Sequence, residues 1–251
     1  MKKMLLALIA LLTAGTLAQT DNRFVYEPVP AEVSVPQAGA VPSDAIVLFD
    51  GSNMDAWMTA AAEEDAHWEI ADGAMTVRPG MRTIKTRQVF GDIQLHLEFR
   101  PSELIQGEGQ SRGNSGVFLH SLFEVQVLDS WNNPTYVNGQ AGAIYLQSAP
   151  LVNVAREPGE WQSYDIIFQS PVYDGRGNLS EPAYVTVLQN GVLVQNHVAL
   201  QGATYTPLPE YTVRCVPYGQ EREQDCSGKM PITLQDHGQV VSYRNIWVRE
   251  L

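Results

Sequence analysis

Short runs of alternating apolar and polar residues, separated by turn residues, make up most of this chain. In DIQLHLEFR, residues 92–100, every second residue from Ile93 to Phe99 is apolar, which is the period of a strand with one buried face. In AYVTVLQNGVLVQNHV, residues 183–198, Asn190 and Gly191 stand between two alternating arms and predict a tight hairpin turn. No convincing helical period extends over more than about ten residues. The pattern therefore predicts an all-β jelly-roll sandwich of two antiparallel sheets.

The N-terminus has a different pattern. Two lysines precede an apolar run from Met4 to Leu12, and small residues lead to Ala18, which predicts a secretory signal peptide over residues 1–18. The alternative is a buried N-terminal helix. Residues 19–44 are rich in Pro, Ala and Val and predict an extended leader or linker, so the jelly-roll domain is expected over residues 45–251. We expect a periplasmic or secreted protein without membrane insertion after signal cleavage.

The charge and the cysteines narrow the choice of partners. The formal charge is −12, and Lys and Arg are not clustered, so a nucleic-acid partner is not expected, whereas a neutral carbohydrate is compatible with an acidic protein. Cys215 and Cys226 lie close together in a loop-like segment, which in an exported protein predicts one local disulfide. A thiolate metal site is the alternative, although such sites usually need four ligands.

Polar residues recur in one strand-like stretch, GNSGVFLHSLFEVQVLDS, residues 113–130. Strand alternation puts Glu124 and Gln126 on one face, and a one-residue bulge near Leu128 would bring Asp129 beside them. The spacing is similar to the E-x-D-x-x-E arrangement of jelly-roll β-glucanases, with Gln126 and Asp129 in place of two of the acids. The alternative is the solvated face of an ordinary sheet. The nearby GQSRG, residues 109–113, matches a nucleophile elbow but has no strand before it, so Ser111 is not expected to be a nucleophile.

A second polar group lies near the C-terminus, in LQDHG. Gln235, Asp236 and His237 end a predicted strand just before Gly238, at a position from which an imidazole can reach a cleft. His120 lies on the strand that leads into Glu124 and is a second candidate histidine. A structural role is the alternative for each of these side chains.

Taken in order along the chain, VLFDGSNMDAW, GNSGVFLHSLFEVQVLD, GEWQSYDIIF and LQDHGQVVSYRNIWVREL resemble the signature blocks of the 3-keto-disaccharide hydrolase domain family. The resemblance covers about residues 45–251 and departs from the family pattern in a Cys-bearing insertion near residues 205–229. It implies a concanavalin-like jelly-roll fold, export from a bacterial cell, and cleavage of glycosides already oxidised at C3.

The resemblance also implies roles for the polar residues. A C3 ketone acidifies the C2 proton, so cleavage by elimination needs a general base, an acid for the leaving oxygen and hydrogen-bond donors for the enolate. Glu124 and His237 are the candidates for acid and base, and they are expected to meet across one concave cleft. Asp129 or Asp236 could orient His237, or with Glu124 could hold a divalent cation; no cofactor is otherwise implied. The expected substrate-binding residues are Asn114, His120, Gln126, Trp131, Gln235 and Asp236.

Two other classes of function remain open from the sequence. A non-catalytic carbohydrate-binding module could use the same fold and the same polar face, with Trp131 as a stacking surface. A structural surface protein would leave Glu124, Gln126 and His237 without a role. The sugar, its linkage and anomer, the choice between hydrolysis and elimination, and the oligomeric state do not follow from the sequence.

Overall fold

The computed structural model describes residues 28–35, 40–174, 176–211 and 228–251. The chain divides into two units, residues 1–34 and residues 35–251. In the first unit, the described residues 28–34 form no helix or strand. All the strands among the described residues lie in the second unit. The predicted signal peptide and the two cysteines lie outside the described residues.

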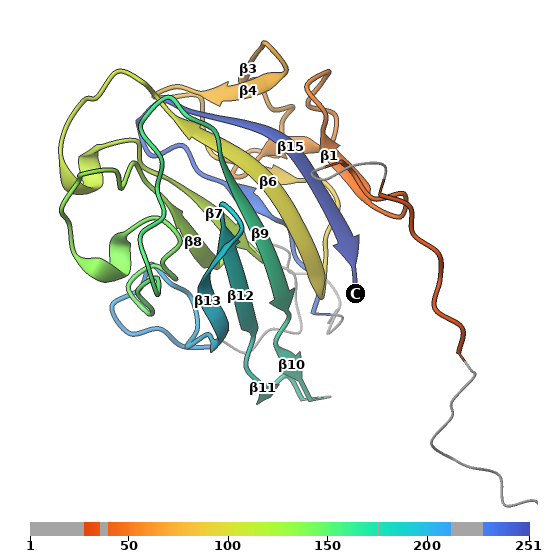
Figure 1. Ribbon diagram of the computed structural model, residues 1–251. Helices are drawn as coiled ribbons and strands as arrows, with labels where there is room; N and C mark the ends of the chain where they lie inside the picture. Colours follow the sequence, from red (N-terminus) through yellow and green to blue (C-terminus); the bar gives the residue numbers. More distant parts are fainter. Residues whose placement is uncertain (1–27, 36–39, 175, 212–227) are drawn as a thin grey trace, which may run out of the picture. The chain divides into compact units, whose positions relative to one another are not determined.

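Among the described residues, eight strands form the larger sheet, with all pairings antiparallel and in the order β13-β12-β9-β6-β15-β4-β3, with β1 also on β15 (Figure 1). The strands are β1 (Ile46–Phe49), β3 (Glu69–Ala71), β4 (Ala74–Val77), β6 (Ile93–Pro101), β9 (Gln162–Gln169), β12 (Tyr184–Gln189), β13 (Val192–Ala199) and β15 (Val241–Glu250). The β3–β4 turn is at Asp72-Gly73 and the β12–β13 turn at Asn190-Gly191; all four residues have positive φ, as tight hairpins require.

Five described strands form the smaller sheet, in the order β2-β5-β14-β7-β8, again antiparallel throughout. They are β2 (Trp57–Thr59), β5 (Ile84–Thr86), β14 (Thr233–Leu234), β7 (Ser115–Leu119) and β8 (Phe123–Val127). A separate hairpin pairs β10 (Val172–Tyr173) with β11 (Leu179–Glu181). The described helices are two short 3-10 turns, η1 (Gly109–Ser111) and η2 (Val137–Gly139), and neither has the length or apolarity needed to cross a bilayer.

The two sheets pack face to face around one apolar core. From the larger sheet, β6 contributes Leu95, Leu97 and Phe99, each fully buried, while the smaller sheet contributes Val117 and Val125. This is the two-sheet antiparallel jelly-roll sandwich that the alternating pattern predicted. Because alternate residues of a strand point to opposite faces, the residues between these core positions in the smaller sheet point away from the core.

Two tyrosine hydroxyl groups connect the sheets directly below β7 and β8. Tyr164 on β9 donates a hydrogen bond to the main-chain oxygen of Gln126 (2.6 Å), and Tyr243 on β15 donates to the side-chain oxygen of Ser115 (2.7 Å). Both rings are fully buried. Buried hydroxyl groups need such partners, so these bonds also hold the two polar strands at a defined depth over the core.

Candidate functional site

The outer face of the smaller sheet, which we call the site face, carries one continuous row of side chains. Met58, Lys85, Thr233, Phe118 and Glu124 are successive cross-strand partners from β2 to β8. Directly opposite residues in neighbouring strands point to the same side. Glu124, at one end of this row, therefore shares its face with the cationic side chain of Lys85.

Glu124 is the most perturbed carboxyl group on this face. Its side chain points away from the core but is only 4% exposed, and burial raises its pKa from the ordinary value of 4.5 to about 8. The neighbouring β7 makes room for it, because a β-carbon at Gly116 would lie 2.4 Å from Oε1 of Glu124 and 2.7 Å from the ring of Phe118. A carboxyl group with a pKa near neutrality can exchange protons in either direction at physiological pH.

A network of amide side chains reaches Glu124 through Gln126. With its nitrogen turned toward Glu124, the side-chain amide of Gln126 donates to Oε1 of Glu124 (3.0 Å) and to the main-chain oxygen of Ser115 (2.9 Å). In this orientation the amide oxygen of Gln126 lies 2.9 Å from the side-chain amide of Gln110. Asn114 donates to the main-chain oxygen of Gln110 (2.8 Å). Gln126 and Asn114 are 1% and 3% exposed, so this network is sheltered from water. It positions the carboxyl group of Glu124 without neutralising it by a cation.

A pair of tyrosines lies close to the same carboxyl group. The hydroxyl groups of Tyr136 and Tyr145 are 2.7 Å apart, and the main-chain nitrogen of Tyr145 donates to the carbonyl oxygen of Glu124. Burial, the hydrogen bond to Tyr145 and the charge of Glu124 all raise the pKa of Tyr136. Tyr136 therefore stays protonated at neutral pH and can act as a hydrogen-bond or proton donor.

The site face also lines a cavity of about 620 Å³, whose walls include Lys85, Phe118, Thr233 and Gln235. That volume is within the usual range for small-molecule sites. The main-chain nitrogen of Gln235 donates to the carbonyl oxygen of Gly116, and Gly116 is the cross-strand partner of Gln126. Gln235 and Gln126 therefore lie on either side of Gly116, with only β7 between them. The side-chain oxygen of Gln235 is buried and accepts no hydrogen bond from the described residues.

Asp129 does not join Glu124 on the site face. The bulge expected near Leu128 is absent, because β8 ends at Val127 in regular register with β7. The Asp129 carboxylate instead forms a buried ion pair with Arg112, with 2.7 Å between Oδ2 and Nε, and accepts a hydrogen bond from the main-chain nitrogen of Trp131. The prediction that Asp129 lies beside Glu124 and Gln126 was wrong, because the cation that pairs with it lies 17 positions earlier in the chain.

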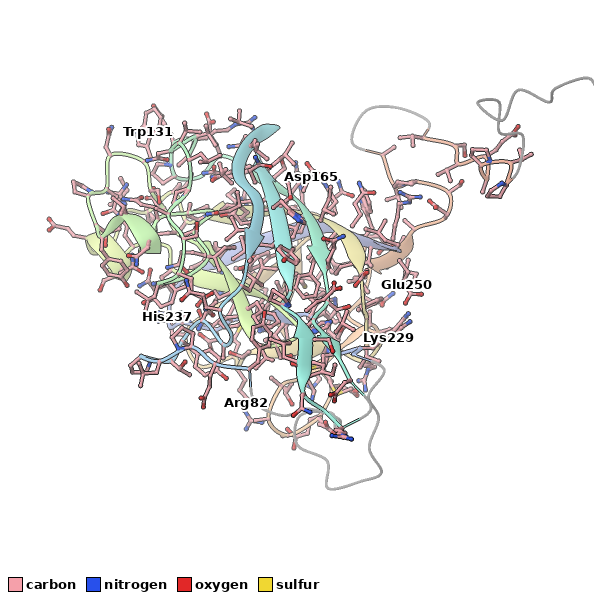
Figure 2. The ribbon with its side chains drawn as sticks, turned by 90° about the horizontal axis from the view of Figure 1, so that it is seen from below. Arg82, Trp131, Asp165, Lys229, His237 and Glu250 are labelled. Atoms are coloured by element: carbon pink, nitrogen blue, oxygen red, sulfur yellow. The ribbon has the colours of Figure 1, made fainter. Side chains whose placement is uncertain are left out.

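Asp236 and His237 follow β14 instead of ending it. The Asp236 carboxylate accepts hydrogen bonds from the main-chain nitrogens of Arg82 (2.9 Å) and Gly238 (2.9 Å), which shapes the turn. His237 is exposed (Figure 2). The described residues supply no hydrogen bond between Asp236 and His237, so the expected orientation of His237 by Asp236 is not present in this structure.

The remaining candidates lie outside the cluster around Glu124. His120 is 3% exposed in the β7–β8 turn, where its Nε2 lies 2.9 Å from the carbonyl oxygen of Phe90 and its ring packs edge-on against Phe168 in the core. Its predicted place on a substrate-binding face was therefore wrong. Trp131 is 38% exposed in the loop after β8, and Figure 2 shows it on the same side of the view as His237. Ser111 lies in the short turn η1 with no helix after it, as expected from the rejected elbow motif.

The described residues contain no group of three or more His, Cys, Asp or Glu side chains that could hold a metal ion. The oxygens of Asp129 and Asp236 have the partners given above, and neither is among the groups that shift the pKa of Glu124. The structure thus does not assemble the cation ligands considered from the sequence.

Sequence reasoning missed four side chains of the site: Lys85, Gln110, Tyr136 and Tyr145. Lys85 is paired with Glu63, with 2.8 Å between Nζ and Oε1, and its side chain is 16% exposed. Lys85 stands between Ile84 and Thr86, both buried, so strand alternation alone could have placed it on the outer face. The two tyrosines come from a loop, and no local pattern indicated their position.

Comparison with known proteins identifies relatives of this site and fold. The family model described as "3-keto-alpha-glucoside-1,2-lyase-like domain" matches residues 44–249. A crystal structure of a protein from Parabacteroides distasonis, proposed to be a glycosyl hydrolase, is 45% identical with a TM-score of 0.81, covering 92% of this chain and 96% of that one. None of the curated proteins matches.

Two further structures from the same organism, also proposed to be glycosyl hydrolases, share the fold at lower identity. One is 18% identical with a TM-score of 0.55, covering 83% of this chain and 94% of that one. The other is 21% identical with a TM-score of 0.55, covering 82% and 99%. The family match spans nearly all of the second unit and includes every element of the site face. The chain therefore belongs to the family of 3-keto-α-glucoside-1,2-lyase-like domains.

Proposed function

We propose that this protein is an exported carbohydrate-active enzyme that cleaves glycosides oxidised at C3, with Glu124 as its general base. The observation that carries the proposal is the buried carboxyl group of Glu124, whose pKa is raised to about 8 and whose cross-strand neighbour Phe118 lines a cavity of about 620 Å³. Membership of the lyase-like family and 45% identity to a proposed glycosyl hydrolase support a carbohydrate substrate.

The proposed reaction is an elimination. The carboxylate of Glu124 removes the proton at C2, and the electron pair of that C–H bond forms the enolate of the C3 ketone. The enolate then re-forms the ketone as the C1–C2 double bond forms and the C1–O bond breaks. The leaving oxygen takes a proton and departs as an alcohol, and the sugar remains as an enone. Addition of water across this double bond would complete a net hydrolysis.

The surrounding side chains have parts in this scheme. The hydrogen-bonded hydroxyl groups of Tyr136 and Tyr145 are close enough to Glu124 for its charge to raise the pKa of Tyr136, and they are the proposed proton donors to the leaving oxygen. Gln235, which lines the cavity, would bind a sugar hydroxyl group through its side-chain amide. Lys85 lies three strands away on the same face and is paired with Glu63, so it has no part in this scheme.

A purely sugar-binding module is less well supported. Burying an ionisable carboxyl group costs free energy, and binding of a neutral sugar does not require a titrating group at that position. In contrast, a base with a pKa near 8 is what removal of a carbon-bound proton at neutral pH requires.

The experiment is a turnover assay with 3-keto-disaccharides and with their unoxidised parents. We expect the enzyme to cleave only the oxidised sugars, and Glu124→Gln to reduce turnover by about 10²–10⁴-fold, the usual contribution of a general base. Glu181→Gln, which removes an exposed carboxylate on β11, is the matched control and should not change the rate. Wild-type turnover that Glu124→Gln leaves unchanged would disprove the assignment.

Export is part of the proposal and has its own test. The apolar run of Met4–Leu12 and the small residues up to Ala18 support signal cleavage. Cell fractionation followed by N-terminal sequencing should find the mature protein outside the cytoplasm and beginning at Gln19. A cytoplasmic protein that retains Met1 would contradict this part alone.

A further inference from the structure

We propose that the cavity on the site face binds an aromatic leaving group, so that the preferred substrates are 3-keto-glycosides of aryl or benzyl alcohols and not disaccharides. This inference rests on the proposed function, because it names the substrate class of the same site. It arises from a difference in chemistry between the two ends of the cavity.

The two ends are defined by β14 and the residues that flank it. Pro231, Thr233 and Gln235 are alternate residues, and all three line the cavity. At about 3.3 Å per residue, Pro231 and Gln235 lie about 13 Å apart along the strand direction. We call the end at Gln235 the amide end, because Gln126 and the carboxyl group of Glu124 lie just beyond it. The end at Pro231 we call the apolar end.

The amide end is the end of the cavity next to Glu124. The main-chain nitrogen of Gln235 donates to the carbonyl oxygen of Gly116, and Oε1 of Glu124 lies over Gly116 on the same face. The 3-keto sugar ring is therefore placed at this end, where its C2 proton comes nearest to Glu124.

At the apolar end the polar groups already have partners. The hydroxyl groups of Ser121 and Thr233 are 2.7 Å apart and bond to each other. Arg87 pairs with Asp65 and also donates to the carbonyl oxygen of Asp55 (3.1 Å). A second sugar unit placed here would have to compete with these bonds for its hydroxyl groups, with little gain in free energy.

Lys229, paired with Glu250, also lines the cavity near Pro231, and aromatic and aliphatic side chains form the other walls of this end. Phe118 and Tyr205 lie with their ring centroids 6.4 Å apart at 58° to each other, and Tyr205 is 52% exposed. Val89, 41% exposed, and Pro231 complete this wall. Two rings at such an angle offer both edge and face contacts to a third ring, the geometries that aromatic pairs prefer. Phe118 is also the cross-strand partner of Glu124. An aromatic ring held against Phe118 would therefore lie near the proposed base, on the side of the sugar where the C1–O bond breaks.

The test compares two 3-keto-glucosides: the benzyl glucoside, and a disaccharide in which glucose is the leaving group. The sugar hydroxyl is the more acidic leaving group, so intrinsic reactivity does not favour the benzyl substrate. We expect kcat/KM to be at least about tenfold higher for the benzyl substrate, because a well-packed aromatic contact typically contributes about that factor to binding. Tyr205→Ala should lower kcat/KM for the benzyl substrate more than for the disaccharide and so remove most of this preference. Tyr184→Ala, a tyrosine on β12 of the larger sheet, is the matched control and should leave the preference intact. Val89→Asn is a second variant on the exposed wall and should act like Tyr205→Ala.

Two outcomes separate this inference from the proposed function. Equal kcat/KM values for both substrates, or a preference that neither Tyr205→Ala nor Val89→Asn reduces, would overturn the aromatic pocket while the reaction stands. Conversely, calorimetry with the unoxidised benzyl and methyl glucosides reports on the pocket without turnover. If no 3-keto-glycoside is cleaved, but the benzyl glucoside binds more tightly than the methyl glucoside and loses this advantage in Tyr205→Ala, the proposed reaction fails and the pocket stands.

Discussion

Replacing Glu124 by Gln should change how the stability of the protein depends on pH. Burial raises the pKa of Glu124 from 4.5 to about 8. Below about pH 4.5 the carboxyl group is protonated in both the folded and the unfolded chain, so it carries no pH-dependent penalty. Between these values the unfolded chain releases the proton and the folded chain keeps it. The free energy of unfolding therefore falls as pH rises, by about 1.4 kcal/mol per pH unit for one proton.

The whole penalty, reached above about pH 8, amounts to about 4–5 kcal/mol. Glutamine has the same shape and carries no charge, so Glu124→Gln should become progressively more stable than the wild type as pH increases. The assay is urea unfolding of both proteins at intervals from pH 5.5 to 7.5, followed by subtraction of the two curves. All other titrating groups are shared, so the difference should rise by about 1.4 kcal/mol per pH unit.

The exposed-carboxylate variant Glu181→Gln is the control, and its curve should run parallel to that of the wild type. Parallel curves for Glu124→Gln as well would refute the reasoning, because Glu124 would then release its proton equally in both states. In that case the carboxyl group is not held protonated by burial, and its selection as the general base loses its physical basis.

Four further predictions concern the same residues. First, kcat/KM for a 3-keto substrate should rise with pH through about 8, because Glu124 must be ionised to act as a base; a rate that falls over this range would make Glu124 an acid. Second, Gly116→Ala should reduce turnover by at least about 10²-fold, since its β-carbon would displace the carboxyl group of Glu124, whereas Gly91→Ala, with nothing closer than 3.6 Å, is the control; equal rates in the two variants would contradict the role of Gly116. Third, Arg112→Met should lower the free energy of unfolding by about 3–5 kcal/mol in urea melts, because it leaves Asp129 buried without its cation, yet the folded fraction should keep its activity. Fourth, His237→Ala should reduce turnover less than about tenfold, because His237 is exposed and free of hydrogen bonds from the described residues; a loss of 10²-fold or more would place it among the reacting groups.

Several features of the fold follow directly from local sequence. The alternation from Ile93 to Phe99 produced β6 with its apolar side in the core, and Asn190-Gly191 produced the β12–β13 hairpin. The same alternation placed Glu124 and Gln126 together on the outer face of β8. These predictions depend on steric preferences of two or three neighbouring residues and on a period of two, which the sequence shows without any tertiary information.

The partners of the polar residues could not be predicted in this way. Asp129 was expected beside Glu124, but it forms an ion pair with Arg112 instead. Whether Asp129 meets Glu124 or Arg112 depends on how separate segments of the chain pack. His120 shows the same limit, since it was expected on a substrate-binding face and is packed into the core instead.

The sequence by itself determined the all-β class, the alternating faces of the strands and the place of Glu124 on an outward face, because each of these is a local consequence of strand geometry. Only the tertiary structure decided that this outward face is buried. Gly116, Phe118 and the loop that carries Tyr145 close around Glu124 from separate parts of the chain, and the loss of water there raises the pKa of the carboxyl group to about 8. Desolvation is the sum of all neighbours of a group in space, so a pattern along the chain can place the carboxyl group but not set its pKa.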